Sequence, residues 1–324
     1  MLILHQPQTA LKKLILGPWD LHHQCTLGLE DPQSDVTVLL DGPGLRRDVT
    51  HNHSMACGAP FTICIGFSQE EYVTAIGIAG LALQFHENSS GKQQLLGEIA
   101  LRFDSSLKIG SQTLFFFQAA AYQNYCLPRR YLWSRSLRDT LQHRSTRDGD
   151  VPITAHESHA MAVFYICPRP VVLTTVAEGS TGNMFPMNVM GNVGNGYFAF
   201  GLNSSRSAAP IVERARRVVL SSIPFGEAAL ASSLRGNHRR PSIDWAELPF
   251  ATRILDRLEA PVPAFALRVR EMQIEGVHKL GSHTLFVAQK TSDERLAHGP
   301  EFFVAHGLYH AWLQRNGFDR IEAS

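Results

Sequence analysis

One stretch of the chain places amide side chains and a proline directly after an apolar, strand-like run. The segment Asn183–Asn188 reads Asn-Met-Phe-Pro-Met-Asn and follows the run Val171–Val176. Asn183, Pro186 and Asn188 present amide and backbone donors and acceptors that can recognise the edge of a flat heteroaromatic ring. Apolar contact area would come from Met184, Phe185 and Met187. The alternative is a simple turn whose asparagines cap the backbone.

A second stretch is suited to an anion. The residues Asn203, Ser204, Ser205, Arg206 and Ser207 follow the apolar run Tyr197–Leu202 and precede the helical pattern Ala208–Arg217. Hydroxyls and free N–H groups at a helix N-terminus favour a phosphate, and Arg206 adds a fork of donors for a bidentate contact. The alternative is an ordinary N-cap at Ser205 or Ser207, with Arg206 in solvent.

The chain repeats itself around a third candidate, His283. Lys108–Phe115 reads KIGSQTLF and Lys279–Phe286 reads KLGSHTLF, and Ala-Leu-Arg stands shortly before each copy. Because His283 replaces Gln112 inside an otherwise preserved segment, it is a candidate functional residue. A histidine held by backbone groups at a strand start is the alternative. The repeat predicts two copies of one fold.

The elements that would position these residues are mainly short strands. Apolar, β-branched or aromatic runs recur through the second half, which predicts a mostly β fold, a β-barrel with covering helices. A β-sandwich or α+β sheets of another topology are the alternatives. Helices are predicted over Glu70–Phe85, Ala208–Arg217, Ala228–Leu234 and Phe302–Gln314. The scarcity of strand-helix-strand alternation argues against a doubly wound parallel sheet.

Length and charge suggest two domains. A chain of 324 residues exceeds the usual size of one core, and the arginine-rich segment Arg129–Asp150 reads as a polar, partly helical connector. We therefore predict domains at 1–145 and 146–324. A second arginine-rich segment, Arg235–Pro241, is predicted to be a solvated loop, and the alternative is that it guides an anionic nicotinamide cofactor.

The composition excludes several classes of protein. Thirty basic and 29 acidic residues give a net charge of +1, which lacks the electrostatic footprint of a nucleic-acid binder. Five scattered cysteines signal neither a disulfide framework nor a cysteine zinc site, and they favour a cytoplasmic location. No apolar run has the length of a membrane span.

The sequence also lacks several catalytic and cofactor-binding motifs. The glycine-rich signatures of dinucleotide and triphosphate sites are absent, as are the serine hydrolase elbow and the HExxH zinc motif.

Taken in order, the Pro168–Val176 run, the Asn183–Asn188 segment, Asn203–Ser207 and the late Gly281–Phe286 segment resemble the flavin reductase-like family. The resemblance covers about residues 150–290, and members of this family bind FMN, or in some cases FAD, in a split barrel. It implies that Asn183–Asn188 face the isoalloxazine ring and that Asn203–Ser207 hold the FMN phosphate. It also implies that His283 lies near the hydride donor, NAD(P)H. Hydride transfer itself requires no protein acid or base, because the flavin carries the electrons.

The first copy departs from the family pattern at the same places. Its loop Arg46–Gly58 lacks the Asn-x-x-Pro-x-Asn arrangement, and Ser68-Gln69-Glu70-Glu71 is acidic where the second copy has Ser-Arg-Ser. Split-barrel proteins of this kind usually dimerise with flavin near the interface. The repeat therefore predicts tandem split-barrel domains that form an intramolecular pseudo-dimer with one site, and a further homodimer stays open.

The preferred hypothesis is a flavin-dependent oxidoreductase that binds FMN, with FAD as an alternative, and takes hydride from NAD(P)H for a small-molecule acceptor. A non-catalytic flavin- or haem-binding split-barrel protein is the alternative. His51, His53 and Cys57 raise a third hypothesis, a metal-dependent enzyme. No fourth ligand is apparent nearby, so no metal site is predicted.

Overall fold

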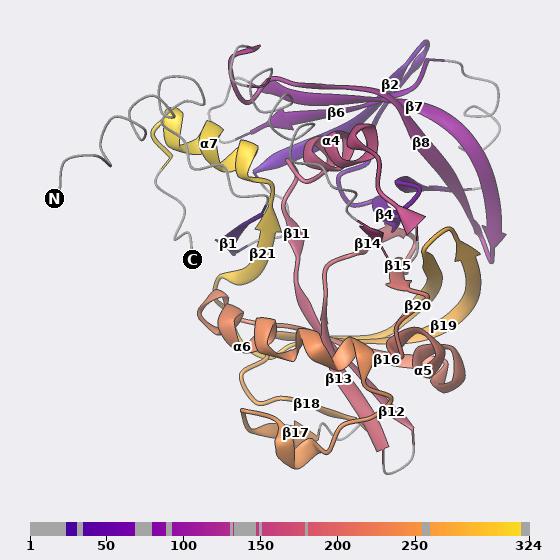
Figure 1. Cartoon of the computed structure of the whole chain (residues 1–324), viewed down its shortest axis with the longest axis vertical. Helices are drawn as coiled ribbons and strands as arrows, with labels where there is room; N and C mark the ends of the chain where they lie inside the picture. Colours follow the sequence, from indigo (N-terminus) through magenta and orange to yellow (C-terminus); the bar gives the residue numbers. More distant parts are fainter. Residues whose placement is uncertain are drawn as a thin grey trace, which may run out of the picture.

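The computed structural model describes residues 24–30, 35–68, 80–88, 93–129, 132, 147–148, 151–178, 181–254 and 260–318. Strands make up most of the regular structure in this part of the chain, and two large sheets dominate it (Figure 1). The mostly β fold class predicted from the sequence is confirmed. Among the described residues, no helix is long and apolar enough to span a membrane.

Two seven-stranded antiparallel sheets form the body of the molecule. The first sheet has the order β3-β2-β6-β7-β8-β5-β4, and the second has the order β13-β12-β16-β19-β20-β15-β14. The strands of the first sheet are β2 (Val36–Gly42), β3 (Leu45–Asp48), β4 (His53–Cys57), β5 (Thr62–Ser68), β6 (Ala82–Glu87), β7 (Gln94–Ile109) and β8 (Gln112–Asn124). Those of the second are β12 (Val172–Glu178), β13 (Thr181–Met187), β14 (Met190–Gly194), β15 (Tyr197–Asn203), β16 (Arg217–Ser222), β19 (Arg268–Leu280) and β20 (His283–Arg295).

When the seven strands of each sheet are numbered along the chain, both sheets have the same spatial order of strands. The repeated octamers lie in matching hairpins, β7–β8 and β19–β20. Each hairpin turns at a glycine with positive φ, 54° at Gly110 and 50° at Gly281, a conformation that favours glycine. Each also has register shifts at corresponding places, Ala100/Leu101 and Glu271/Met272. The local sequence repeat therefore coincides with a repeat in topology.

The sheets meet through reciprocal contacts. A Cβ on Gly66 in β5 would overlap the carbonyl of Val193 in β14, and one on Gly201 in β15 would lie 2.9 Å from the carbonyl oxygen of Ala56 in β4. Small side chains at these crossing points let the backbones approach closely. Apolar residues from both sheets then form one core at the junction, including Ala56, Cys64, Leu114, Phe116, Val193, Tyr197, Ala199, Leu285 and Val287.

A third, three-stranded sheet joins distant parts of the chain. It has the order β1-β21-β11, with β1 at Cys25–Leu29, β21 at Glu301–Ala305 and β11 at Arg169–Pro170. Successive side chains of a strand point to opposite faces, so Phe302 and Val304 face one side of this ribbon while Glu301 and Phe303 face the other. Two small ladders complete the β structure, β9 (Arg147–Asp148) with β10 (Val151–Pro152) and β17 (Thr252–Ile254) with β18 (Pro261–Pro263).

Helix α4 (Ala155–Phe164) packs on the first sheet. Thr154 and Glu157 form a capping box at its N-terminus, which supplies partners for the first free N–H groups. The other helices are α5 (Ala208–Ala215), α6 (Ala228–Ser233) and α7 (Gly307–Arg315). Three 3₁₀ segments, Phe225–Glu227 (η1), Leu234–Arg239 (η2) and Trp245–Glu247 (η3), lie in the second half of the chain.

Several predicted helix boundaries are wrong. Residues 302–305 form most of β21, because these apolar side chains are buried where the strand pairs with β1 and β11, and the helix begins only after His306 caps it. Residues 82–85 belong to β6, paired between β2 and β7, whereas residues 70–79 lie outside the described part. The predicted helix Ala208–Arg217 stops at Ala215, since Arg217 already pairs in β16.

The connector and the domain boundary lie almost entirely outside the described residues, apart from Arg129, Leu132 and the short strand β9.

The sequence prediction missed α4. Its Thr-x-x-Glu capping box is a local signal that could have identified the helix.

Candidate functional site

A cavity of about 360 Å³ opens in the second sheet beside the three-stranded ribbon. The end of β13 and the turn after it form one wall, the end of β15 forms another, and α6 and η2 close a third side. Its lining residues are Gln24, Val171, Pro186, Met187, Asn188, Val189, Gly201, Leu202, Asn203, Arg206, Ser232, Arg235, His238, His283, Phe302 and Val304. Three stretches that are distant in sequence therefore border one space, namely the Pro186–Val189 turn, the Asn203–Arg206 segment and His283.

The first half of the Asn183–Asn188 segment supports this cavity without lining it. Asn183, Met184 and Phe185 continue strand β13 and are fully buried. Asn183 Nδ2 donates to the carbonyl oxygens of Asn237 at 2.9 Å and Arg240 at 2.8 Å. In return, Asn237 Nδ2 donates to the carbonyl oxygen of Met184 at 2.8 Å. These bonds fix η2 against β13, so Asn183 holds a wall of the cavity in place.

The second half of the segment reaches the cavity. Pro186, Met187 and Asn188 line it at the point where β13 ends. His238 Nε2 donates to the carbonyl oxygen of Pro186 at 2.8 Å, and the His238 ring lies 4.6 Å from the Phe185 ring between centroids. Burial lowers the pKa of His238, and the charge of Arg206 lowers it further against the effect of the Pro186 hydrogen bond. His238 is therefore a neutral side chain of the wall.

The anion-suited segment has its own internal bonds. Asn203 Oδ1 accepts from Ser205 N at 2.9 Å and from Ser205 Oγ at 2.7 Å, which makes a tight turn before α5. Ser204 Oγ lies 3.0 Å from Thr284 Oγ1, and Ser207 Oγ donates to the carbonyl oxygen of Arg239 at 2.9 Å. These hydroxyls fix the backbone, whereas Asn203 and Arg206 line the cavity.

The positive charge in the cavity comes from two arginines. Arg206 and Arg235 line it, and no hydrogen bond or ion pair involves either guanidinium within the described part of the chain. An arginine whose donors are not already engaged can bind phosphate or carboxylate bidentately. The cavity lining therefore combines the positive charge of Arg206 and Arg235 with apolar side chains such as Met187 and Phe302.

His283 is held by the first sheet. The backbone N–H of Gly58 donates to His283 Nδ1 at 3.3 Å, Ser282 Oγ lies 2.9 Å from the same nitrogen, and Cys57 Sγ lies 3.7 Å from it. Because an amide N–H can only donate, Nδ1 is an acceptor and the neutral ring carries its proton on Nε2. The first half of the chain thus sets the tautomer of a side chain that lines the cavity of the second half.

Two of the three residues of the metal hypothesis, His53 and Cys57, have other partners. His53 Nδ1 lies 2.6 Å from the carbonyl oxygen of Val49, its Nε2 contacts the guanidinium of Arg169, and Cys57 Sγ donates to the carbonyl oxygen of Leu280 at 3.0 Å. Burial, and then the charge of Arg169, hold the pKa of His53 well below its usual value. Among the described residues, no group of three or more histidine, cysteine or acidic side chains could hold a metal ion.

Several lining residues carried no usable local signal. The sequence pattern predicts a helix for Phe302 and Val304, and a solvated loop or a guide for an anionic cofactor for Arg235 and His238. The structure instead places the last two in η2, which is anchored to β13 by buried bonds. Basic side chains in that segment were visible in the sequence. Their position at the cavity depends on the pairing with Asn183, which only the tertiary structure supplies.

A model of the flavin reductase like domain matches residues 164–296. That range carries the whole second sheet, and with it the Pro186–Val189 turn, Arg206 and His283. No curated protein matches the chain.

Solved structures with a similar arrangement include three flavin proteins. An FMN-binding protein from Thermus thermophilus is 21% identical, with 40% of this chain and 71% of that chain covered and a TM-score of 0.36. An NADH:FAD oxidoreductase from Streptomyces globisporus C-1027 is 18% identical, with coverage of 46% and 87% and a TM-score of 0.41. The styrene monooxygenase flavin reductase of Pseudomonas putida S12 is 14% identical, with coverage of 46% and 92% and a TM-score of 0.38.

Proposed function

We propose that this protein is a flavin reductase that binds FMN in the cavity of the second sheet and accepts hydride from NAD(P)H. The observation that carries the proposal is the shared cavity of the Pro186–Asn188 turn, Arg206 and His283, inside the region that matches the flavin reductase like domain. FAD is the alternative cofactor. A small-molecule acceptor and a cytoplasmic location belong to the same proposal.

The donor set of the cavity fits a flavin phosphate and ring. Arg206 and Arg235 would hold the phosphate, because their guanidinium groups have no partner among the described residues. The Asn188 amide and the backbone of the turn would meet the polar edge of the ring, with Met187 against its face. When bound, the flavin supplies the hydride-accepting chemistry, and the protein supplies orientation and polarity.

His283 is the proposed contact to the hydride donor. Its Nε2 proton makes it a hydrogen-bond donor, and Nδ1 is the acceptor for the Gly58 N–H. A neutral donor suits an amide or carbonyl oxygen of a nicotinamide ring better than a charged imidazolium that would have to be desolvated.

The first sheet would act as the partner that a dimeric split-barrel protein obtains from a second chain. Two features support this pseudo-dimer: the shared strand order and the reciprocal contacts Gly66–Val193 and Gly201–Ala56. Gln112 of the first sheet lies near Gly194 of the second, and His283 of the second sheet lies near Cys57 of the first. These two contacts occupy corresponding positions of the two sheets. The proposal places one cofactor site per chain and leaves a further homodimer open.

An absorbance spectrum of the purified protein, followed by FMN titration and NADH or NADPH addition, tests the function. Flavin absorbance that is bleached by one of the nicotinamide cofactors is the expected result. Flavin that binds but is not reduced would favour the non-catalytic carrier, and a haem spectrum would favour the haem-binding alternative. A colourless protein without a fluorescence change on FMN titration would refute the proposal.

A further inference from the structure

A second cavity, of about 200 Å³, lies between the two sheets and is rich in charge. Thr50, His51 and His53 of the first half form one side, and Arg268, Arg270, Lys290 and Asp293 of the second sheet form another. Glu301 and Pro170 belong to this cavity, whereas Phe302 and Val171 belong to the first one. The two cavities therefore lie on opposite faces of the β11–β21 ribbon.

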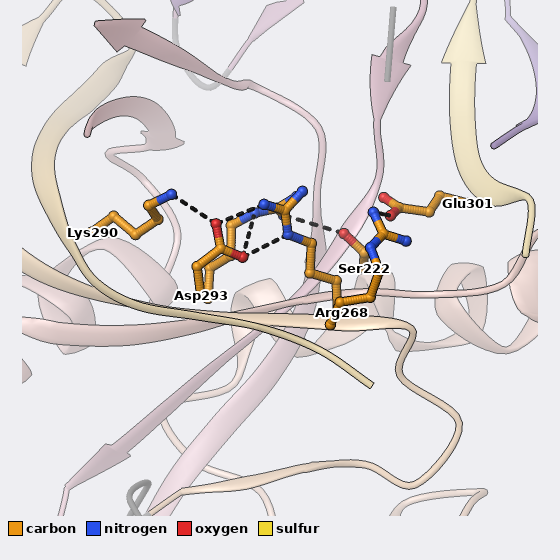
Figure 2. A network of polar contacts seen from close by, with 7 residues as sticks. Ser222, Arg268, Lys290, Asp293 and Glu301 are labelled. Carbon is orange, nitrogen blue, oxygen red and sulfur yellow. Dashed lines mark hydrogen bonds and ion pairs between the residues drawn. The ribbon is translucent and has the colours of Figure 1, made fainter. Parts of the chain in front are cut away.

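In this cavity, one carboxylate accepts hydrogen bonds from two basic side chains (Figure 2). Asp293 accepts from Arg268 Nε and Nη2, both at 2.6 Å, and from Lys290 Nζ at 2.7 Å. Burial alone would raise the pKa of Asp293, but the Arg268 and Lys290 bonds outweigh it and hold the pKa at about 2. Asp293 is thus ionised, and Arg268 and Lys290 are its two close partners.

Arg270 is the least closely paired of the basic side chains around Asp293 and Glu301. Its side chain is only 10% exposed, its Nη1 donates to the neutral Ser222 Oγ at 3.2 Å, and its Nε lies 3.9 Å from Asp293 Oδ1, beyond hydrogen-bond range. Burial, and next the charge of Arg268, lower the pKa of Arg270, whereas the charges of Asp293 and Glu301 act to raise it. Guanidinium donors with no strong acceptor at this depth leave desolvated positive charge in the cavity.

The network around Arg270 carries a surplus of positive charge. Ion pairs join four basic side chains, Arg268, Arg270, Lys290 and Arg295, to two carboxylates, Asp293 and Glu301. Four positive charges against two negative charges leave a surplus of two. Arg295 Nη2 lies 3.4 Å from Glu301 Oε1, so Glu301 is already paired. A ligand with about two negative charges would balance the network.

The corresponding place on the first sheet is filled by a helix. The alignment that pairs Lys108 with Lys279 also pairs Gly97, Ile99 and Ala119 with Arg268, Arg270 and Lys290. On the first sheet, α4 and the residues after it cover this face. Val163 and Ile166 lie directly over Gly97, and His156 Nε2 donates to the Ala119 carbonyl oxygen at 2.9 Å. On the second sheet the same face carries arginines and lysine, and a cavity remains open above it.

We propose that this second cavity binds a small phosphate monoester. The phosphoryl group would lie against Arg270 and Lys290, since its charge of about −1.5 to −2 matches the surplus of two. The organic body would rest on the apolar wall formed by Met190, Phe198 and Pro170. The site is separate from the proposed flavin cavity and does not depend on it.

Calorimetric titration of the full chain with phenyl phosphate tests the proposal. We expect one phenyl phosphate per chain and an affinity at least tenfold lower in Arg270→Met. Lys290→Met, at the more exposed rim, should have the same effect and decides the outcome if Arg270→Met does not fold. Arg102→Met, an exposed arginine of the first sheet, is the matched control and should bind as the wild type does.

Further probes separate the phosphate from its carrier and from the first cavity. Benzyl alcohol should not bind, and inorganic phosphate should bind more weakly than phenyl phosphate if the apolar wall contributes. Equal binding of the two phosphates would assign the site to free phosphate. Phenyl phosphate should bind Arg206→Gln with unchanged affinity, whether or not FMN binds the wild type.

Three results would overturn the site. They are no phenyl phosphate binding at millimolar concentration, equal affinity in both cavity variants and the wild type, and loss of binding in Arg206→Gln.

Discussion

The two large sheets share a strand order but differ in what their matching positions can do. Where the second sheet has His283, the first has Gln112, and where the second has Asn203 followed by Arg206, the first has Ser68 followed by an acidic stretch of sequence. Helix α4 covers a face of the first sheet that stays open and charged on the second. The two sheets thus share one topology and differ in a few side chains at strand ends, and the chemistry of a site depends on such side chains and not on the fold.

The contact between the sheets should be the most sensitive feature. Gly66→Ala places a methyl group on the Val193 carbonyl, where neither backbone can yield without moving a strand, so we expect a loss of about 3 kcal/mol or more in unfolding free energy. Chemical denaturation measures this. Gly226→Ala, whose added Cβ meets nothing within 4 Å, is the control. An unchanged midpoint in Gly66→Ala would mean that the sheets do not pack as described.

Loss of the proposed phosphate contact at Arg206 should be the next largest effect. Arg206→Gln removes a charge-assisted bond to the proposed phosphate, so the Kd for FMN should rise about 10- to 100-fold, with the unfolding midpoint unchanged. Fluorescence titration with FMN measures the Kd. Arg102→Gln on the first sheet should leave it unchanged. Equal FMN affinities in both variants would remove Arg206 from the proposed site.

Sequence patterns could predict the mostly β class, the repeat and part of the cavity lining. Pro186, Met187, Asn188, Asn203, Arg206 and His283 all come from segments with distinctive residue types. Asn183–Phe185 were expected at the same surface but lie buried in β13, because a segment that reads as a turn continues the strand and pairs with β12. Strand pairing is a tertiary property, and local turn residues do not determine it.

The rest of the lining depends on contacts between distant parts of the chain. Phe302 and Val304 reach the cavity through β21, which pairs with β1 at the start of the described residues. Gly58 reaches His283 through packing of the two sheets. Neither relation leaves a pattern in the local sequence, so composition and periodicity could not reveal it.

Low pH should lower the stability of the protein through Asp293 of the charged second sheet, and not through the helix-covered first sheet. The pKa of Asp293 is held at about 2 in the folded protein, below its ordinary value of 3.8, so the folded state favours the ionised form. This stability is fully present above pH 4 and is lost as the pH falls from about 4 towards 2, by at most ~2 kcal/mol. Denaturation midpoints measured between pH 2 and 6 report the loss.

Asp293→Asn should flatten that part of the pH profile, because Asn cannot titrate. Asp104→Asn, an exposed carboxylate on β7 of the first sheet, is the control and should keep the wild-type slope. If Asp293→Asn and the wild type lose stability in parallel below pH 4, Asp293 does not carry the acid sensitivity.

The smallest predicted effect tests the one difference inside the repeated octamers. His283→Gln gives the second hairpin the residue that the first has at Gln112, so the hairpin should fold normally. Loss of the Nε2 donor should lower kcat/KM for the nicotinamide cofactor about tenfold, while the Kd for FMN stays within about twofold. Stopped-flow reduction of bound flavin measures the first quantity and fluorescence titration the second.

A structural role for His283 would give the opposite pattern. If the ring only fills the space beside Cys57 and Gly58, His283→Gln should shift the unfolding midpoint and leave the reduction rate of folded protein unchanged. Gln112→His on the first sheet completes the exchange and should not create a second site. The cavity of the second sheet also needs Arg206 and the Asn188 turn, and the first sheet has Ser68 and Thr50 near the corresponding positions. Two bound FMN per chain in Gln112→His would show that one residue, and not the strand-end set, separates the two sheets.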